Sequence, residues 1–346
     1  MKYVIEKDVL KRVEIEDGDT EIAIPDGVKE LNEYFNYESF PYGKEEEQKQ
    51  ILRVRIPASL EALNMSDTSN CFSELENLKE ILVDERNPVY ESIDGVLFEN
   101  HNETKTLVAF PRGLACREYA IPEGVTNIRN AAFDCVFDGP FELKFPKSLK
   151  SVDMRCSGTY NVIKRVTIYD NLSCDFCDIG WGYYDTWFWN CNCMSDLVIT
   201  VLSADDNTVK YIIPLMFSVD RDTKAGEACA KAGMAFNPIN SADLSVIDKC
   251  YEVTRDKELK LMTAAFRIGW PHMLNSEAKE RYEKYLSRYI QLAVETAIKK
   301  EYFELIEVFI NNKLIEKSAY PKILDAVDGP QHKELKNRLL EYYDKL

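Results

Sequence analysis

A repeated phrase of five residues constrains this chain more than any other feature. An apolar residue precedes a proline, two small or polar residues follow, and a second apolar residue closes the phrase. The copies are residues 24–28, 56–60, 121–125 and 145–149, and residues 168–172 have the same form without the proline. The last three copies begin 24 and 23 residues apart (121 to 145, then 145 to 168). A fixed period in the twenties predicts a solenoid, in which stacked neighbours bury what one unit cannot bury alone.

Each copy predicts the same short piece of structure. The residues before the proline alternate between apolar and polar, as in 52–56, which is typical of a half-buried strand. The proline cannot donate to a strand ladder and therefore ends the strand. A further apolar residue follows three positions after the phrase, at Leu31, Leu63, Ile128 and Val152. Phe133 is expected to fill the core between units from a short helical turn.

Residues 121–135 carry a resemblance to a known family. They begin Ile-Pro-Glu-Gly-Val-Thr-Asn-Ile and end Ala-Ala-Phe-Asp-Cys, and they resemble the BspA-like (type 5) leucine-rich repeats of bacterial proteins. The segment 87–111 resembles the β-hairpin insertion of that family, which explains the 65 residues between Ile56 and Ile121. Cys135 comes one position early for the pattern, and residues 35–51 and 153–196 depart from the register. The resemblance covers about residues 1–215 and implies an α/β leucine-rich-repeat solenoid that recognises proteins or surfaces, with no catalytic or cofactor residues.

The repeat pattern stops near residue 220, which predicts two domains. We expect a leucine-rich repeat domain over 1–218, with the insertion at 87–111 and a closing hairpin at 197–213 that caps the open end of the solenoid. A smaller all-α domain is expected over 219–346, since apolar residues there follow a helical period and Ser276 suits a helix start. The spacing of Leu305, Phe309 and Ile310 recurs thirty residues later in Leu335, Leu339 and Leu340. This second repeat resembles ankyrin-like helix pairs, and an ordinary helical bundle is the alternative.

The charge of the chain excludes some partner classes. The net charge is −16. Residues 1–219 hold 22 Lys and Arg against 38 Asp and Glu, whereas residues 220–346 hold 21 of each. Nucleic acid is not expected as a partner, because phosphate binding needs a basic stripe. A basic protein partner would suit the acidic excess, but a solvated acidic surface is the favoured interpretation.

The apolar segments and the first residues predict where in the cell the protein is located. No run approaches the ~20 apolar residues of a membrane span. The first eight residues include Glu6 and Asp8 where a secretory signal has an apolar run, so a cytoplasmic protein is expected.

Four clustered cysteines are the strongest candidate for chemistry. Cys174 and Cys177 form one close pair and Cys191 and Cys193 another, and four thiolates in two pairs can bind zinc. The second pair is a Cys-x-Cys, a poorer chelating turn, and no histidine lies nearby. We therefore expect reduced, metal-free cysteines, with Cys71 and Cys135 as small buried core residues among the ten.

An aromatic segment lies between the two cysteine pairs. It contains three of the four tryptophans of the chain within nine residues. An exposed segment of this kind would bind a partner, whereas a buried one would pack on the helical domain, and packing is favoured because an uncovered apolar patch promotes aggregation. The candidate partner-binding residues are Trp181, Tyr183, Tyr184, Trp187 and Trp189.

The remaining residues show no catalytic constellation. His101, His272 and His332 are the only histidines, and none accompanies a serine or cysteine motif of known mechanics. The sequence therefore predicts a non-catalytic scaffold that binds another protein through its repeat surface, without cofactor, nucleic acid or membrane span. Self-assembly is the second hypothesis, and a zinc- or thiol-dependent activity at the four cysteines is the third.

Overall fold

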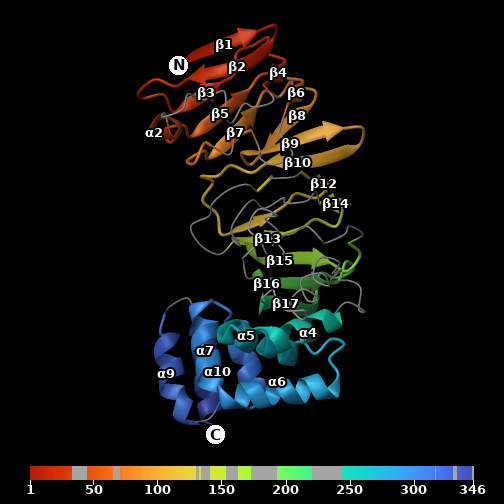
Figure 1. Ribbon diagram of the computed structural model, residues 1–346, viewed down its shortest axis with the longest axis vertical. Coiled ribbons are helices and arrows are strands. Elements are labelled where there is room, and N and C mark those ends of the chain that lie inside the picture. The colour runs from red at the N-terminus through yellow and green to blue at the C-terminus, as the bar shows by residue number, and fades with distance from the viewer. Residues whose placement is uncertain are drawn as a thin grey trace. The chain divides into compact units, whose positions relative to one another are not determined.

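The protein has a mixed α/β architecture (Figure 1). The computed structural model describes residues 1–32, 45–64, 71–72, 74–129, 132–133, 141–152, 163–172, 193–219, 244–315, 317–329 and 333–344. The chain divides into two compact units, residues 1–183 and residues 184–346.

The first unit is built from two series of short parallel strands. The first series has two groups in separate sheets: β3 (Glu21–Ala23), β5 (Arg53–Ile56) and β7 (Glu80–Val83), then β11 (Glu118–Ala120), β13 (Phe141–Lys144) and β15 (Ile163–Tyr169). The second series also has two groups in separate sheets: β2 (Val9–Glu14), β4 (Glu30–Leu31) and β6 (Ala62–Leu63), then β12 (Asn127–Ile128) and β14 (Ser151–Val152). Each five-residue phrase begins at or next to the end of a strand of the first series, and each of the four phrases with a proline leads to a strand of the second, β4, β6, β12 or β14. The predicted alternation is confirmed in β5, where Val54 is buried and Arg55 is exposed.

The repeated phrases all form the same turn. In each of the five, the backbone N–H of the closing apolar residue donates to the carbonyl oxygen three positions earlier, over 3.1 to 3.3 Å. The donors are Val28, Leu60, Val125, Leu149 and Leu172. The fifth turn keeps this bond although Tyr169 replaces the proline, so the turn does not require the proline.

Two more turns of this form occur where the sequence analysis did not expect them. Leu114 N–H donates to the Pro111 carbonyl over 3.2 Å, and Asn87 N–H donates to the Asp84 carbonyl over 2.8 Å. Residues 110–114 fit the phrase in full. In residues 83–87 an aspartate stands at the proline position and an asparagine closes the turn, so the pattern cannot be recognised in the sequence.

A serine joins consecutive turns in two places. Gly27 N–H donates to Ser59 Oγ over 2.9 Å, and that hydroxyl donates over 2.8 Å to the carbonyl of the valine after the glycine. Gly124 and Ser148 repeat the arrangement with the same two distances. Both glycines have positive φ angles, 91° and 92°, which side-chain-bearing residues rarely adopt. In these two pairs the third turn position is glycine in one turn and serine in the next, because the serine hydroxyl bonds to the backbone of the glycine turn.

The expected hairpin insertion is a three-stranded meander. β8 (Tyr90–Ile93), β9 (Val96–His101) and β10 (Thr104–Ala109) pair antiparallel in order. β10 also pairs in parallel with β12, so the insertion is continuous with the second series of strands. The Tyr90 hydroxyl accepts a hydrogen bond of 3.0 Å from Leu63 N–H at the end of β6.

Phe133 fills the core of the first unit, as predicted. Its side chain is 1% exposed and its ring centroid lies 5.4 Å from that of Phe110 and 6.4 Å from that of Tyr119. Cys71 is buried, and burial raises the pKa of its thiol, which keeps it protonated at neutral pH. Cys135 lies outside the described residues.

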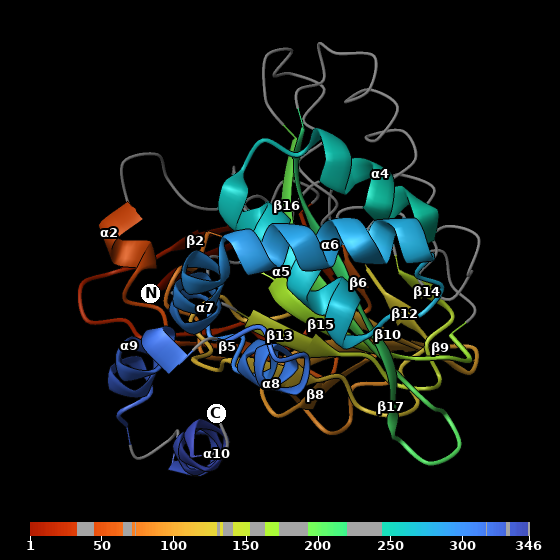
Figure 2. The ribbon, with the colours of Figure 1, turned by 90° about the horizontal axis from the view of Figure 1, so that it is seen from below.

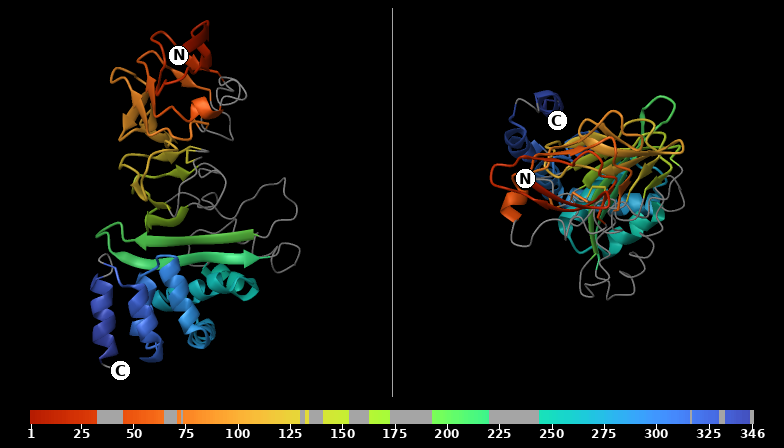
Figure 3. Two further views of the ribbon diagram at one scale, coloured as in Figure 1. Left: turned by 90° about the vertical axis from the view of Figure 1, so that its left-hand side faces the viewer. Right: turned by 90° about the horizontal axis from the view of Figure 1, so that it is seen from above.

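The second unit combines a long hairpin with helices (Figure 3, left). β16 (Cys193–Leu202) and β17 (Val209–Val219) pair antiparallel along their length. Val198, Ile212 and Met216 of this hairpin belong to the same buried core as the helices. The helices are α4 (Ser245–Val253), α5 (Lys257–Gly269), α6 (Ser276–Arg288), α7 (Ile290–Lys299), α8 (Glu304–Asn311), α9 (Tyr320–Ala326) and α10 (Lys333–Tyr343). Helix α5 packs on β17, and α6 lies across α5 (Figure 2).

The hairpin, expected in the repeat domain, shares a buried core with the helices. The domain boundary after residue 218 stays a prediction. A partly buried ion pair reinforces the grouping, since Lys300 Nζ lies 2.7 Å from an oxygen of Asp196 on β16. The unit from 184 onward is therefore mixed, and its helices do not form an all-α body by themselves.

The helix ends follow from local residues. Asp256 accepts a hydrogen bond from Leu259 N–H and Asn275 from Ala278 N–H, so each side chain caps a helix. Helix α6 begins at Ser276 as expected, although its capping residue is Asn275. In the weak helical repeat, Ile310 is buried whereas the matching Leu340 is 40% exposed, so these two positions differ in environment.

Candidate partner-binding surface

The residues singled out for binding or metal chemistry cannot be placed. The aromatic residues Trp181, Tyr183, Tyr184, Trp187 and Trp189 lie outside the described residues. So do Cys174, Cys177 and Cys191, whereas Cys193 begins β16 and its side chain is not described. Within the described residues, no group of three or more His, Cys, Asp or Glu side chains is arranged to bind a metal ion.

The structure instead draws attention to one face of the first strand series. Parallel pairing places Glu21, Arg53 and Glu80 side by side across β3, β5 and β7. The Arg53 guanidinium contacts a carboxylate oxygen of Glu80 and lies 3.4 Å from one of Glu21. Acid, base and acid thus alternate across three neighbouring strands.

Arg55 extends this row along β5. Its Nε lies 2.7 Å from Glu21 Oε1, while its side chain remains 52% exposed. Partial burial alone would raise the pKa of Glu21, but hydrogen bonds and charge from Arg55 and Arg53 outweigh it and hold that pKa below its usual range. We call Glu21, Arg53, Arg55 and Glu80 the charged strand face.

A second charged row occurs on β11, β13 and β15. Their register places Glu118, Glu142 and Arg165 side by side, and Arg165 Nε lies 3.4 Å from Glu142 Oε1. Two residues after Glu142 on β13, Lys144 Nζ lies 5.9 Å from the ring centroid of Tyr169. The outward positions of both strand groups therefore carry charge, while the inward positions form the core.

The charged strand face has the properties of a recognition surface. Its side chains stand on rigid strands with fixed spacing, and ion pairs this exposed contribute only about 0–1 kcal/mol each. A partner can therefore exchange its own charged groups for the internal ones at low cost. The face has no arrangement of nucleophile, base and oxyanion donors that would indicate a reaction.

The second unit has a cluster of tyrosines and cations that the sequence analysis did not identify. Tyr251, Tyr285 and Tyr289 of α4 and α6 form successive edge-to-face contacts of 6.1 and 5.1 Å. Lys257 Nζ lies 3.7 Å from the Tyr289 ring centroid and Lys260 Nζ 4.8 Å from that of Tyr251. Burial lowers the pKa of Lys260. Each cation already has an aromatic partner, so the cluster stabilises the packing of α4, α5 and α6.

A buried arginine is the other polar centre of the second unit. Arg267 is 1% exposed, lies 3.4 Å from Asp248 Oδ1 and donates to the His272 carbonyl over 2.9 Å. Tyr282 donates to the same Asp248 oxygen, and burial together with that carboxylate raises the pKa of its phenol. The His272 side chain is exposed but its ring stacks on Tyr211 at 4.1 Å, and partial desolvation and the Arg267 charge lower its pKa. These contacts join α4, α5, α6 and β17.

The charged strand face could have been anticipated only in part. The alternation in 52–56 predicts that Arg53 and Arg55 point outward. Their pairing with Glu21 and Glu80 spans 32 and 27 residues, and these unequal spacings hide the register until the loops are built. No helix within the described ranges is long and apolar enough to cross a membrane.

Three bacterial structures resemble part of the chain. A leucine-rich repeat protein from Eubacterium ventriosum is 19% identical over 45% of this chain and 38% of its own, with a TM-score of 0.34. A leucine-rich cell surface protein from Faecalibacterium prausnitzii is 18% identical over 44% of this chain and 54% of its own, with a TM-score of 0.27. The pneumococcal vaccine antigen PcpA is 18% identical over 45% of this chain and 46% of its own, with a TM-score of 0.30.

The match is therefore partial on both sides. This chain spans about half or less of the length of those three proteins. No protein-family model and no curated protein matches it.

Proposed function

We propose that the chain is a non-catalytic scaffold that binds another protein, and that residues 1–183 form a BspA-like leucine-rich-repeat solenoid. The observation that supports this proposal is the charged strand face on β3, β5 and β7. Its alternating carboxylates and guanidinium groups select a partner by charge complementarity. A partner with acidic and basic side chains spaced along an extended surface fits this face.

The solenoid assignment itself is supported by the turns. The same kind of hydrogen bond closes all the repeated phrases. Two joints between turns each use a glycine N–H and a serine hydroxyl in the same arrangement. The strands that follow phrases 24–28 and 56–60 pair in parallel, and so do those that follow 121–125 and 145–149. Repeats of this kind present an extended surface and no enclosed pocket, which suits protein binding.

A matched pair of charge reversals tests the proposed function. Arg55→Glu changes the charged strand face, whereas Lys29→Glu makes the same charge change away from it. The two side chains are 52% and 51% exposed, so the variants are comparable. A protein captured by the full chain from its native extract, and identified by mass spectrometry, is expected to bind Arg55→Glu about tenfold more weakly.

The control decides between surface-specific and general effects. Lys29→Glu is expected to bind the captured protein as the unaltered chain does. Equal loss in both variants, or equal binding by both, would contradict the assignment of this face. Cytoplasmic location is part of the proposal and is tested by fractionating the producing cells.

A further inference from the structure

The first strand of the protein has an open edge. β1 (Lys2–Glu6) pairs with β2 on one side, in a sheet of order β1-β2-β4-β6. No strand within the described residues pairs with its other side. Val4 and Ile5 are 37% and 42% exposed, which is unusual here for large apolar side chains. An edge of this kind is a template for another strand.

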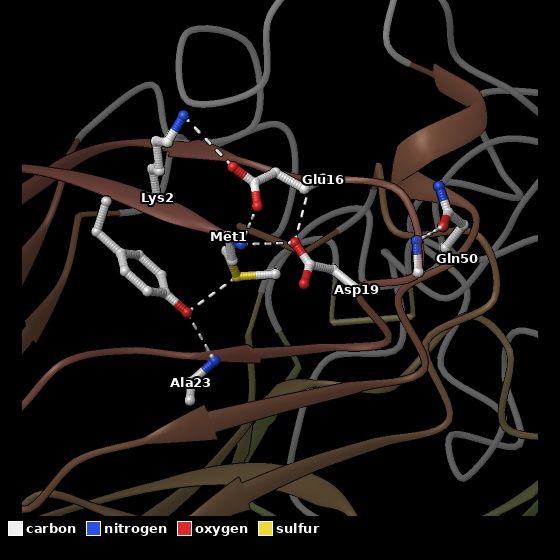
Figure 4. A network of polar contacts seen from close by, with 8 residues as sticks. Met1, Lys2, Glu16, Asp19, Ala23 and Gln50 are labelled. Atoms are coloured by element: carbon white, nitrogen blue, oxygen red, sulfur yellow. Dashed lines mark hydrogen bonds and ion pairs between the residues drawn. The ribbon is translucent and has the colours of Figure 1, made fainter.

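β1 is also held in position from within its own unit (Figure 4). The Met1 amine lies 2.9 Å from an oxygen of Asp19 and 3.2 Å from one of Glu16. The Tyr3 hydroxyl contacts Met1 Sδ at 2.9 Å and accepts a hydrogen bond from Ala23 N–H on β3. A strand fixed in this way needs little further ordering when another strand adds to it.

The sequence of β1 is complementary to itself in one arrangement. The register against β2 shifts between Val4 and Ile5, where β2 has one extra residue, Lys11, while β1 itself has none. Side chains alternate along an extended strand, which places Lys2, Val4 and Glu6 on one face of β1. In an antiparallel pair centred on Val4, Lys2 lies opposite Glu6 of the second copy at both ends. Val4 then lies opposite Val4, and Tyr3 opposite Ile5. A parallel in-register pair would instead place Lys2 against Lys2 and Glu6 against Glu6, which is unfavourable.

From this complementarity we propose that a second copy of the chain adds to β1 as an antiparallel strand, with the two-fold axis at Val4. The sheet then continues from one protomer into the other. Lys2 is free to turn toward the new carboxylate, because its 3.4 Å ion pair with Glu16 is exposed and weak. Glu6 forms no ion pair with the described residues.

The size of the contact makes this a weak dimer. Five residues a side bury much less than the ~1,200–2,000 Å² of a stable interface. We expect mainly monomer at ~1 µM and a measurable dimer at about 0.1–1 mM, so the dissociation constant lies between micromolar and millimolar. The dimer does not depend on the charged strand face, so the two proposals fail separately.

Charge exchange between two variants tests the pairing by sedimentation equilibrium. Lys2→Glu places Glu opposite Glu at both ends, and Glu6→Lys places Lys opposite Lys. Each variant alone is expected to weaken the dimer about tenfold. When the two are mixed, both ends pair opposite charges again, so dimer is expected to return to within about threefold of the unaltered protein.

The mixture also separates pairing from misfolding, because a variant that fails to fold cannot be rescued by its partner. Lys284→Glu, on the exposed side of α6, makes the same charge change as Lys2→Glu and is expected to leave the dimer unchanged. A protein that stays monomeric at the highest concentration overturns the proposal. A dimer that ignores both β1 variants, or a mixture that does not recover, overturns it as well.

Discussion

At the scale of single residues, two serine side chains connect consecutive turns of the repeat through hydrogen bonds. Ser59 Oγ serves a backbone N–H and a backbone C=O of the preceding turn at once. Removing it leaves both groups without that partner, because the glycine at the preceding turn has no side chain to replace it.

We therefore expect Ser59→Ala and Ser148→Ala each to lower the free energy of unfolding by about 0.5–1.5 kcal/mol. Urea denaturation of the full chain measures the loss. Ser→Thr at the same positions keeps the hydroxyl and serves as the control. If alanine and threonine have equal effects, the hydroxyl bonds contribute nothing to stability.

His272 makes the stability of the second unit depend on pH. Partial desolvation of the exposed His272 side chain, and after it the Arg267 charge, hold its pKa below the ordinary value of about 6.5. The unfolded chain therefore binds a proton at higher pH than the folded chain does. Stability is full above about pH 6.5 and is lost as the pH falls from there toward the folded-state pKa.

His272→Phe keeps a ring against Tyr211 and removes the titration. We expect the unaltered protein to lose stability relative to this variant as the pH falls below about 6.5. Thermal unfolding across that range shows the difference, and an NMR titration of the His272 ring reports its pKa directly. A ring pKa at or above 6.5 would refute the assignment.

At the scale of elements, the contact between α5 and α8 depends on the absence of a side chain. A Cβ at Gly269 would lie 2.5 Å from Val308 Cγ2, closer than carbon atoms approach. Alanine normally stabilises a helix by about 1 kcal/mol relative to glycine. Here the overlap reverses the sign.

Gly269→Ala is expected to destabilise the protein by about 1–3 kcal/mol. Val308→Ala removes the obstructing methyl groups, so the double variant should recover part of the loss. Chemical denaturation of the single and double variants gives the coupling between the two sites. Additive losses would show that the helices do not meet as described.

The elements also show how far the sequence alone could predict this fold. The proline phrase and the period of two identify the turns at 25, 57, 122 and 146 because each is a local signal. The turn at Asp84 has neither proline nor an apolar closing residue, so only its hydrogen bond reveals it. The hairpin β16–β17 was recognised, but its core partners are helices 35 or more residues away (Met216 to Tyr251), and no local pattern encodes such contacts.

For the candidate surface, the sequence could assign direction but not neighbours. The alternation of apolar and polar residues shows that Arg53 and Arg55 face outward. Which carboxylates lie beside them depends on the lengths of the two loops that set the strand register. The aromatic segment attracted attention by density alone, and density does not determine exposure. Trp187 and Trp189 remain candidates for binding on that basis.

At the scale of the whole molecule, each compact unit has its own buried core. Phe133→Ala removes a ring of the first unit that is 1% exposed and packs against Phe110, and it is expected to cost about 3–5 kcal/mol. In calorimetry of the full chain, Phe133→Ala should lower the transition temperature of the first unit only. Gly269→Ala should lower that of the second unit only. A loss below about 1 kcal/mol, or one transition that both variants shift equally, would contradict this.

The pairing of a glycine turn with a serine turn limits how such an array can lengthen or shorten. The Gly27 turn is completed by a serine turn, and the Gly124 turn by another, whereas the Ser59 turn is followed by Asn87, whose amide donates to the Pro57 and Leu60 carbonyls. Duplicating or deleting one repeat leaves a glycine N–H without its serine or sets two serine turns against each other. Copying a glycine turn and its serine turn together preserves every joint within the block, so gene duplications that keep this architecture should proceed two repeats at a time.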